Sequence, residues 1–396
     1  MRAHSFSLKP TDYCNLACDY CYSPNSKRRN SIDAEAINAL VDRMVSDFPP
    51  DQQFLIVWHG SEPLAVGQDF YDRTLGLFRE TLGTRVRHHI QTNLTMLDDE
   101  WCEFLQLNKV SVSTSIDGPK SIHDTHRRGP TGKGSFDTVL GNILKLKNRR
   151  VPVSAILVLT KTTLPHIDGV YALLQQLAIP IRINPVLLPL NHPGCLPPEA
   201  YGEFVIGLAK RWLKADVMFD LEPVREIVLR LVSGKTITCD QEALCYRHLT
   251  GVATDGSLYP CNRFIGVPGF RLGHITDTTL PSVPSLPLSK KTEMRHVNSP
   301  KCQACRLLHV CNGGCMYHAH VIYGNAFKED YFCQSYLLLT EFVLANLAKL
   351  LRHLGRIAVD PSLDAVAASA DVLAREVLAA EASVTETAYG SVSNPN

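Results

Sequence analysis

Short apolar segments and amphipathic segments alternate along the first half of the chain. Six short apolar runs, most of them with β-branched residues and typical of buried strands, occur at residues 4–10, 54–60, 88–93, 109–118, 151–160 and 181–188. Helical periodicity separates them, as in Ile37, Leu40, Val41, Met44 and Val45. Six successive strand–helix units predict an α/β fold, a partial (β/α)6 barrel of the TIM type over residues 1–214.

After about residue 215 the pattern changes. The cysteines become dense between residues 239 and 333, with a Pro- and Ser-rich segment at 281–289 among them. Helical periodicity returns at about 335–355, and an Ala-rich segment at 365–382 predicts one more helix before a polar tail typical of disorder. We therefore expect a Cys-rich domain at 215–345, then C-terminal helices and a disordered tail at 346–396.

Composition narrows the class of protein. The chain of 396 residues has a formal net charge of +1, which gives no electrostatic case for binding nucleic acid or an anionic membrane. It has neither a run of about 18 apolar residues nor the apolar core of a secretion signal. A cytoplasmic enzyme is the expectation, and in a reducing compartment its 13 cysteines are metal ligands or catalytic groups more often than disulfides.

The stretch CNLACDYCY places Cys14, Cys18 and Cys21 in the loop after the first strand. In a barrel of this kind, chemistry occurs on the loops that follow the strands. Zinc sites and cubane iron–sulfur clusters normally take four protein ligands. A cubane held by these three thiolates keeps one iron open to a small molecule with an amine and a carboxylate. The alternative is a structural zinc loop with a distant fourth ligand.

The Cys-x3-Cys-x2-Cys spacing, with Tyr20 before the third cysteine, resembles the radical S-adenosylmethionine (SAM) superfamily. The resemblance implies a [4Fe–4S] cluster that binds SAM and cleaves it reductively to a 5′-deoxyadenosyl radical, so that the difficult chemistry belongs to the cofactor.

Three strand ends carry further motifs of this family: WHGSEPL, QTNLT and SIDG, the last followed by RR. The resemblance implies that Glu62 lies in the motif that contacts the amino group of SAM, and that Arg127 pairs with its carboxylate. Ser61 replaces a glycine of the family motif, a change that still allows the turn. Asp117 is either a ribose contact or a turn-former. The full set of expected SAM contacts is Tyr20, Gly60, Ser61, Glu62, Asn93, Ser115, Asp117 and Arg127.

The cysteines of the second half resemble a SPASM domain, the C-terminal extension of radical SAM enzymes that modify peptides and proteins. The resemblance implies two auxiliary [4Fe–4S] clusters with interleaved ligands, three clusters in all. Auxiliary cluster I would use Cys239, Cys245, Cys261 and Cys315. Auxiliary cluster II would use Cys302, Cys305, Cys311 and Cys333. Spacing alone also allows two zinc sites, as in a zinc-binding interaction module.

Residues 4 to about 345 are similar to anaerobic sulfatase-maturating enzymes and to maturases of ribosomally made peptides. Sulfatase maturases have an aspartate as general base directly after the cysteine that corresponds to Cys261. Asn262 stands here, and an amide cannot accept that proton. Asp255 precedes Gly256 in an ordinary turn signal. We therefore expect oxidative crosslinking of a precursor peptide, by a cyclophane carbon–carbon bond or a thioether, with formylglycine formation as the alternative.

The expected partners are the precursor peptide and a flavodoxin- or ferredoxin-type electron donor. Because the barrel starts by residue 4, we expect leader binding by a separate protein, the SPASM surface or the helix after residue 360. The sequence does not choose a catalytic base. Cys102 is interpreted as a buried small hydrophobe. Cys195, in a Pro-flanked loop, is a surface thiol or a substrate contact.

Overall fold

The computed structural model describes residues 3–23, 30–215, 219–234, 239, 242, 245–277 and 299–358. The chain divides into two compact units, Met1–Cys195 with Leu244–Glu293 and Leu196–Ala243 with Met294–Asn396. This grouping differs from boundaries at 214 and 345, which stay predictions. The expected helix at 365–382 and the linker at 281–289 lie outside the described residues.

The first unit contains a sheet of parallel strands. In chain order these are β1 (His4–Leu8), β2 (Phe54–Trp58), β3 (Val86–Gln91), β4 (Ser111–Ser115), β5 (Val153–Leu159) and β6 (Ile181–Pro185). Each strand pairs in parallel with the next one. They confirm the six predicted strands and the α/β class.

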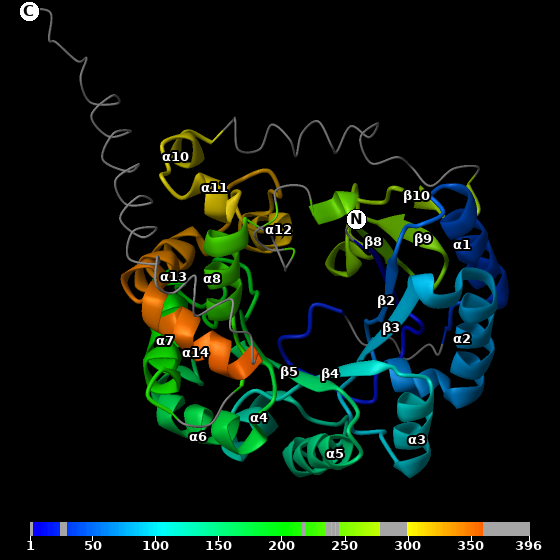
Figure 1. Cartoon of the computed structure of the whole chain (residues 1–396), viewed down its shortest axis with the longest axis horizontal. Coiled ribbons are helices and arrows are strands. Elements are labelled where there is room, and N and C mark those ends of the chain that lie inside the picture. Colours follow the sequence, from blue (N-terminus) through cyan, green and yellow to red (C-terminus); the bar gives the residue numbers. More distant parts are fainter. Residues whose placement is uncertain are drawn as a thin grey trace, which may run out of the picture. The chain divides into compact units, whose positions relative to one another are not determined.

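Helices alternate with these strands: α1 (Ala34–Ser46), α2 (Gln68–Leu82), α3 (Asp99–Leu107), α4 (Lys120–His126), α5 (Phe136–Asn148) and α6 (Ile167–Leu177). Figure 1 shows α1, α2, α3 and α5 on the outer side of the strands. The helix starts follow from their caps, since Asp33 accepts from the Ala36 N–H group and Asp98 from that of Trp101. The predicted apolar stripe of α1 is buried except for Val45, which is exposed.

Three more strands, β8 (Leu249–Val252), β9 (Ser257–Tyr259) and β10 (Gly273–His274), extend the sheet beyond β1. β8 is parallel to β1, whereas β9 is antiparallel to both β8 and β10. The Asp255–Gly256 turn joins β8 to β9, and Gly256 has a φ of +81°, as that turn signal predicts. The segment after residue 244 therefore belongs to the barrel unit, which the sequence did not indicate.

The two faces of each barrel strand have different surroundings. Trp58 of β2 is fully buried against aromatic side chains of α2 and stacks on His88 of β3. Leu55 and Val57 alternate with the buried residues of β2 and are only half-buried. Successive side chains of a strand point to opposite faces. The face opposite the helices can therefore line cavities at the strand ends.

Short 3₁₀ helices complete the first unit, at Pro63–Val66, Gly83–Arg85, Leu164–His166, Cys245–Arg247 and Asn262–Phe264. Cys102 is fully buried in α3, which confirms its interpretation as a small hydrophobe. Cys195 is also buried, at 7% exposed, so the expectation of a surface thiol is wrong. The preceding loop turns at His192, whose carbonyl accepts from the Cys195 N–H group, and brings this thiol inward.

The second unit is mainly helical. Its elements are α7 (Pro198–Trp212), β7 (Leu221–Glu222), α8 (Val224–Ser233), α10 (Pro300–Gln303), α11 (Leu308–Cys311), α12 (Met316–Tyr323), α13 (Cys333–Ala345) and α14 (Leu347–Ala358). α13 packs closely on α7, where Ser335 Oγ donates to the Pro198 carbonyl at 2.5 Å. The buried Arg230 guanidinium of α8 donates to the Val310 carbonyl of α11. Within the described residues, no helix is long and apolar enough to cross a membrane.

Candidate active site

Cys14, Cys18 and Cys21 lie in the loop after β1 and line one cavity of about 220 Å³, which we call the three-thiol cavity. Cys14 and Cys18 are half-buried, and Cys21 is exposed. The Asn93 amide nitrogen lies 3.8 Å from Cys14 Sγ, and Arg127 Nη1 lies 4.0 Å from Cys18 Sγ. Burial raises the pKa of Cys14 to about 12 and that of Cys18 to about 11, so metal binding must displace their protons.

Arg127 and Asp117 form a buried ion pair beside this loop. Arg127 Nε donates to Asp117 Oδ2 at 2.7 Å, and the Tyr20 hydroxyl donates to the same oxygen. Burial alone would raise the pKa of Asp117, but the Arg127 guanidinium holds it below its usual value. The guanidinium also lies over the Tyr20 ring, 5.4 Å from its centroid. With Nε engaged, the terminal N–H groups of Arg127 are the donors available to a ligand carboxylate.

His123 holds this ion pair in place. Its Nδ1 accepts from the Asp117 N–H group at 3.3 Å, so Nε2 carries the ring proton and donates to Ser135 Oγ at 2.9 Å. Ser135 Oγ in turn donates to the Arg127 carbonyl at 2.9 Å. Burial lowers the pKa of His123 to about 4, which keeps the ring neutral and this arrangement intact at neutral pH.

The turn after β2 presents Gly60 and Ser61 to the three-thiol cavity. Gly60 has a φ of +99°, and a Cβ atom there would lie 2.9 Å from Lys9 Cγ. Ser61 has a φ of +54°, so it takes the left-handed conformation that a glycine adopts more readily, and the turn is kept as predicted. Ser61 Oγ is buried and has no hydrogen-bond partner among the described residues. An unpaired buried hydroxyl on a cavity wall is a place for a ligand to bind.

Glu62 joins the ends of β2 and β3. Its Oε1 accepts from the Leu64 N–H group at 3.0 Å and from Thr92 Oγ1 at 2.6 Å, and its Oε2 accepts from the Asn93 N–H group at 2.8 Å. Burial raises the pKa of Glu62 despite these bonds. Neither Glu62 nor Asp117 lines the three-thiol cavity, and both are fully buried. A direct contact of either carboxylate with SAM stays a prediction.

The other expected contacts all line the three-thiol cavity: Tyr20, Gly60, Ser61, Asn93, Ser115 and Arg127. The cavity also includes polar side chains that the sequence analysis missed, namely His59, Gln91, Asn184 and Arg263. The first three lie at or near the carboxyl ends of β2, β3 and β6. These three residues could have been predicted from the sequence, because a polar residue at the end of an apolar barrel strand often lies in the active site.

Asn262, the residue that stands where a base is expected in sulfatase maturases, contacts Tyr22. Asn262 Nδ2 donates to the Tyr22 hydroxyl at 2.9 Å, and that hydroxyl lies 3.1 Å from His59 Nε2. Burial lowers the pKa of His59 to about 4, with a contribution from Arg263, so this imidazole is neutral. Tyr22 also lines a neighbouring cavity of about 360 Å³ that contains Asp255. Asn262 therefore helps to fix the wall between two cavities.

Gln91 is fixed by a line of hydrogen bonds along the strands. Ser113 Oγ donates to Gln91 Oε1, and Ser113 Oγ lies 2.6 Å from His89 Nε2. His89 Nδ1 lies 2.8 Å from Ser111 Oγ. If each hydroxyl donates once, His89 donates through Nε2 and accepts at Nδ1. With its oxygen engaged, Gln91 offers its amide N–H groups to the three-thiol cavity.

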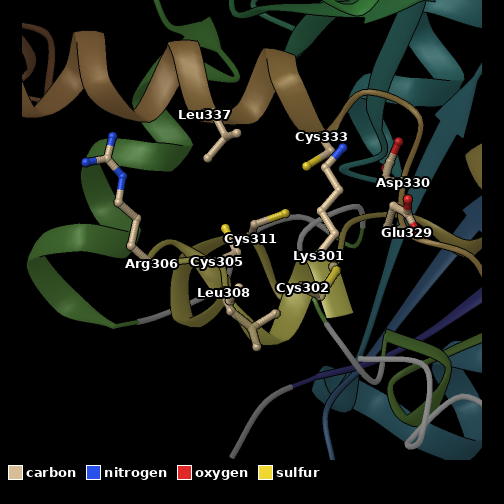
Figure 2. Close-up of a pocket in the computed structure, with 12 residues that line it drawn as sticks. Lys301, Cys302, Cys305, Arg306, Leu308, Cys311, Glu329, Asp330, Cys333 and Leu337 are labelled. Carbon is tan, nitrogen blue, oxygen red and sulfur yellow. The ribbon is translucent and has the colours of Figure 1, made fainter. Parts of the chain in front are cut away.

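The second unit holds another group of thiols. Cys302, Cys305, Cys311 and Cys333 line a cavity of about 280 Å³, which we call the four-thiol cavity. Figure 2 shows these four side chains around one space between α10, α11 and the start of α13. Burial raises the pKa of Cys311 and of Cys333, so these are neutral thiols until a metal binds. The structure thus brings together the four ligands expected for auxiliary cluster II.

The four cysteines expected for auxiliary cluster I are divided between the units. Cys245 and Cys261 belong to the first unit, and Cys239 and Cys315 to the second. In the first unit β8 packs tightly on the Cys261 backbone, since a Cβ atom at Gly251 would lie 2.5 Å from the Cys261 carbonyl carbon. The meeting of these four thiols stays a prediction. Among the described residues, no group of three or more His, Cys, Asp or Glu side chains surrounds a single-ion position.

The sequence that forms most of the three-thiol cavity matches a known family. Residues 8–174, which contain the three-cysteine loop and the motifs after β2, β3 and β4, match the family model of the radical SAM superfamily. The chain carries a radical SAM domain. It is therefore an enzyme, and the predicted architecture of a radical SAM partial barrel is confirmed.

Known relatives of this radical SAM enzyme are similar over most of its length. A cysteine-type anaerobic sulfatase-maturating enzyme of Clostridium novyi is 27% identical over 367 residues, which cover 88% of this chain and 97% of the relative. The structure of native anSMEcpe with bound AdoMet has a TM-score of 0.77 at 26% identity and covers 87% of this chain and 98% of that one. Streptococcus suis SuiB bound to precursor peptide SuiA, at a TM-score of 0.60 and 16% identity over 84% of this chain and 76% of that one, shares the fold.

The residues of the three-thiol cavity fit SAM and a [4Fe–4S] cluster, which the radical SAM family implies. Three thiols supply one fewer ligand than a cubane has irons. On the same cavity, Arg127 offers N–H donors suited to a carboxylate, and the buried hydroxyl of Ser61 has no partner within the described part of the chain. The three thiols therefore match a cluster with one open iron. Arg127 and Ser61 match a ligand that has a carboxylate and further polar groups.

Proposed function

We propose that this radical SAM enzyme oxidises side chains of a ribosomally made precursor peptide and joins them by a carbon–carbon or thioether crosslink. When bound, the reduced cluster and SAM supply a 5′-deoxyadenosyl radical that removes a hydrogen atom from a substrate carbon. An anaerobic sulfatase-maturating enzyme is similar to the chain over 88% of the chain's length, and the fold is shared with SuiB, whose structure contains a precursor peptide.

The chain's own residues have distinct tasks in this proposal. Cys14, Cys18 and Cys21 hold the cluster, and Arg127 holds the carboxylate of SAM. The ion pair with Asp117 keeps the guanidinium in one orientation, because a bonded Nε limits rotation of the group. Two auxiliary [4Fe–4S] clusters on the eight cysteines of the second half complete the proposed set of three.

In this proposal, the side chain at position 262 distinguishes crosslinking from formylglycine formation. After a hydrogen atom has been removed, either oxidation must still release one electron and one proton from the substrate. An amide cannot take up that proton at neutral pH. Asn262 instead donates to Tyr22 at 2.9 Å. A reaction that relies on a carboxylate at this position is therefore disfavoured, whereas crosslinking leaves the base to be supplied elsewhere.

Formylglycine formation is the second candidate, because the relative from Clostridium novyi is a sulfatase-maturating enzyme aligned over 97% of its length. Asp255 lines the cavity next to Tyr22. Its Oδ1 already accepts from the Ser257 N–H group at 2.9 Å, within the β8–β9 turn. This carboxylate is the nearest substitute in the sequence for the missing aspartate, and Asp255→Asn tests it.

The experiment compares two peptides with enzyme, SAM and a reductant under anaerobic conditions. One is a candidate precursor peptide, sought among short reading frames beside the gene, and the other carries a sulfatase-type Cys or Ser site. Crosslinking removes two hydrogen atoms per bond and leaves no aldehyde. Tandem mass spectrometry locates the bond, and a hydrazide reagent detects formylglycine, which mass alone does not distinguish when the target is Ser.

We expect a crosslinked precursor and no hydrazide-reactive product. An aldehyde on the sulfatase-type peptide as the only product would make sulfatase maturation the better assignment. Asn262→Asp is the informative variant, because it restores a carboxylate in the same volume. It should raise any aldehyde activity, and Asn262→Gln, which stays an amide, is the matched control.

A further inference from the structure

Asp330 is a buried carboxylate beside the four-thiol cavity, at 1% exposed. Its Oδ2 accepts from the Cys315 N–H group at 2.7 Å and from His318 Nδ1 at 2.9 Å. Its Oδ1 accepts from the Phe332 N–H group at 2.8 Å, and the Tyr336 hydroxyl lies 3.4 Å from Oδ2. These donors occupy both oxygens of the Asp330 carboxylate.

The backbone of Asp330 connects the same segments. Its carbonyl accepts from the Cys333 N–H group at 3.1 Å, at the start of α13, and its N–H group donates to the Gly313 carbonyl at 3.2 Å. Cys333 lines the four-thiol cavity, whereas Cys315 is an expected ligand of the other auxiliary cluster. One residue thus positions the backbone of one cysteine from each expected set.

The loop before Cys315 packs tightly on Asp330. A Cβ atom on Gly314 would lie 2.3 Å from Asp330 Cβ, a distance that packed atoms do not tolerate. Gly314 has a φ of +70° and directly precedes Cys315. The loop that carries Cys315 therefore lies directly against Asp330, and any side chain at position 314 must push the two apart.

We propose that Asp330 is a positioning residue that fixes Cys315 and Cys333 and lowers the reduction potential of the clusters they ligate. Two physical effects act in the same direction. The Cys315 N–H group is used by Asp330, so it cannot donate to a cluster sulfur, a bond that would raise the potential. The negative charge beside the cavity also disfavours the addition of an electron. The inference rests on the proposed auxiliary clusters.

The test uses the full-length chain with Cys14, Cys18 and Cys21 changed to Ala, so that only iron on the second half remains. Asp330→Asn in this background keeps the side-chain shape, removes a negative charge and turns one acceptor into a donor. Potentiometric titration followed by electron paramagnetic resonance should show a shift to more positive potential with the iron content retained. An unchanged potential with retained iron overturns the inference.

This background separates two kinds of failure. If the triple-Ala protein binds no iron and sulfide, the auxiliary clusters are absent and the proposed function loses its support. If it binds them and Asp330→Asn has no effect, only the role of Asp330 is wrong.

A pair of glycine variants tests the positioning directly, including the case in which Asp330→Asn does not fold. Gly314 and Gly324 have similar φ angles, +70° and +68°, but a Cβ atom on Gly324 meets nothing within 4 Å. Gly314→Ala and Gly324→Ala therefore share backbone strain, and only the former displaces Asp330. A chelator should remove iron from Gly314→Ala at about tenfold lower concentration. Equal sensitivity of the two variants overturns the inference.

Discussion

The two thiol-lined cavities differ in whether their polar side chains are already hydrogen-bonded to protein groups. In the three-thiol cavity, Arg127, Ser61 and Gln91 line the space with donors or an unpaired hydroxyl. Beside the four-thiol cavity, the oxygens of Asp330 accept hydrogen bonds from backbone N–H groups and from His318.

The difference indicates what each cavity is for. A metal site with three protein ligands and polar groups that face inward is built to receive a small molecule. A cubane with four thiol ligands has no open iron, and the Asp330 carboxylate beside this cavity already accepts from protein donors. Under the proposed function, the first cavity would serve catalysis and the second would store or transfer electrons.

The largest effect should come from removing the thiols of one cavity at a time. The anaerobically purified protein should be brown, with about 12 iron atoms per chain. Changing Cys14, Cys18 and Cys21 to Ala should abolish SAM cleavage and remove about a third of the iron. Iron and sulfide analysis and the yield of 5′-deoxyadenosine measure both effects.

Changing Cys302 and Cys305 to Ala is the complementary variant. It should lose iron from the second unit while SAM binding persists, because neither residue lines the three-thiol cavity. A colourless protein with stoichiometric zinc would contradict both expectations and favour a zinc-binding module.

The next effect is on the affinity for SAM. Arg127→Ala removes a charge-assisted contact, which costs about 1.5–3 kcal/mol, or roughly ten- to hundredfold in affinity, measured by equilibrium binding. The variant should keep its iron. Arg128→Ala is the matched control, because this exposed neighbour donates to the Asp124 carbonyl.

Arg127→Ala also leaves the Asp117 charge buried and unpaired, which destabilises the fold by itself. The double variant Arg127→Met with Asp117→Asn removes both charges and should fold better while still binding SAM weakly. Normal SAM binding by Arg127→Ala would show that the contact assigned to it is wrong.

Local patterns in the sequence predicted most of the barrel strands and turns. They did not predict contacts between residues that are far apart in the sequence. The six barrel strands follow from short apolar runs, most of them with β-branched residues, and each run is readable within a few positions. β8 was missed because its pairing with β1 joins Ser5 to Leu249, and no local pattern encodes such a register. The hairpin turn at Asp255 and Gly256 was readable because it depends on neighbours alone.

The same distinction holds for the sites. Motifs gave the identity of Glu62 but not the direction of its carboxylate, which is set by Thr92 and Asn93, some 30 residues away. The resemblance to a SPASM domain implied the set of four cysteines that lines the four-thiol cavity. It could not reveal Asp330, whose bond to the Cys315 N–H group depends on how the loop folds back.

A smaller effect should follow from loosening Gln91. His89→Phe removes the ring that orients the Ser113 hydroxyl toward Gln91, so the Gln91 amide can rotate and present its oxygen to the three-thiol cavity. Loss of this hydrogen-bonded line should weaken ligand binding by about two- to tenfold, equivalent to about 0.5–1.5 kcal/mol. The binding constants of SAM and of the peptide, measured separately, show which ligand Gln91 contacts.

His88→Phe is the control for this experiment. His88 is the next residue in β3, but it lies against Trp58 on the other face of the strand. Burial lowers the pKa of both histidines to about 4, so charge does not distinguish them. If His88→Phe weakens ligand binding as much as His89→Phe does, the effect is a general loss of packing.

The smallest effect concerns acid stability and contrasts the buried histidines of the two units. In the second unit His318 faces a carboxylate, whereas His4 of the first unit faces the Thr250 hydroxyl, 3.1 Å from its Nε2. Burial lowers the pKa of His4 to about 4, with a contribution from His248. The folded pKa lies below the unfolded value of about 6.5, so the unfolded chain binds more protons between these limits.

The stabilising contribution of His4 is therefore complete above about pH 6.5 and declines as the pH falls toward 4. Between pH 7 and 5.5, His4 alone should lower the free energy of unfolding by about 1 kcal/mol. His4→Gln should reduce the change in the free energy of unfolding between pH 7 and 5.5, measured by urea denaturation, by that amount. His166→Gln, at an exposed position, should leave this change as it is. An unaltered pH dependence in His4→Gln would mean that this ring does not stay neutral in the folded protein.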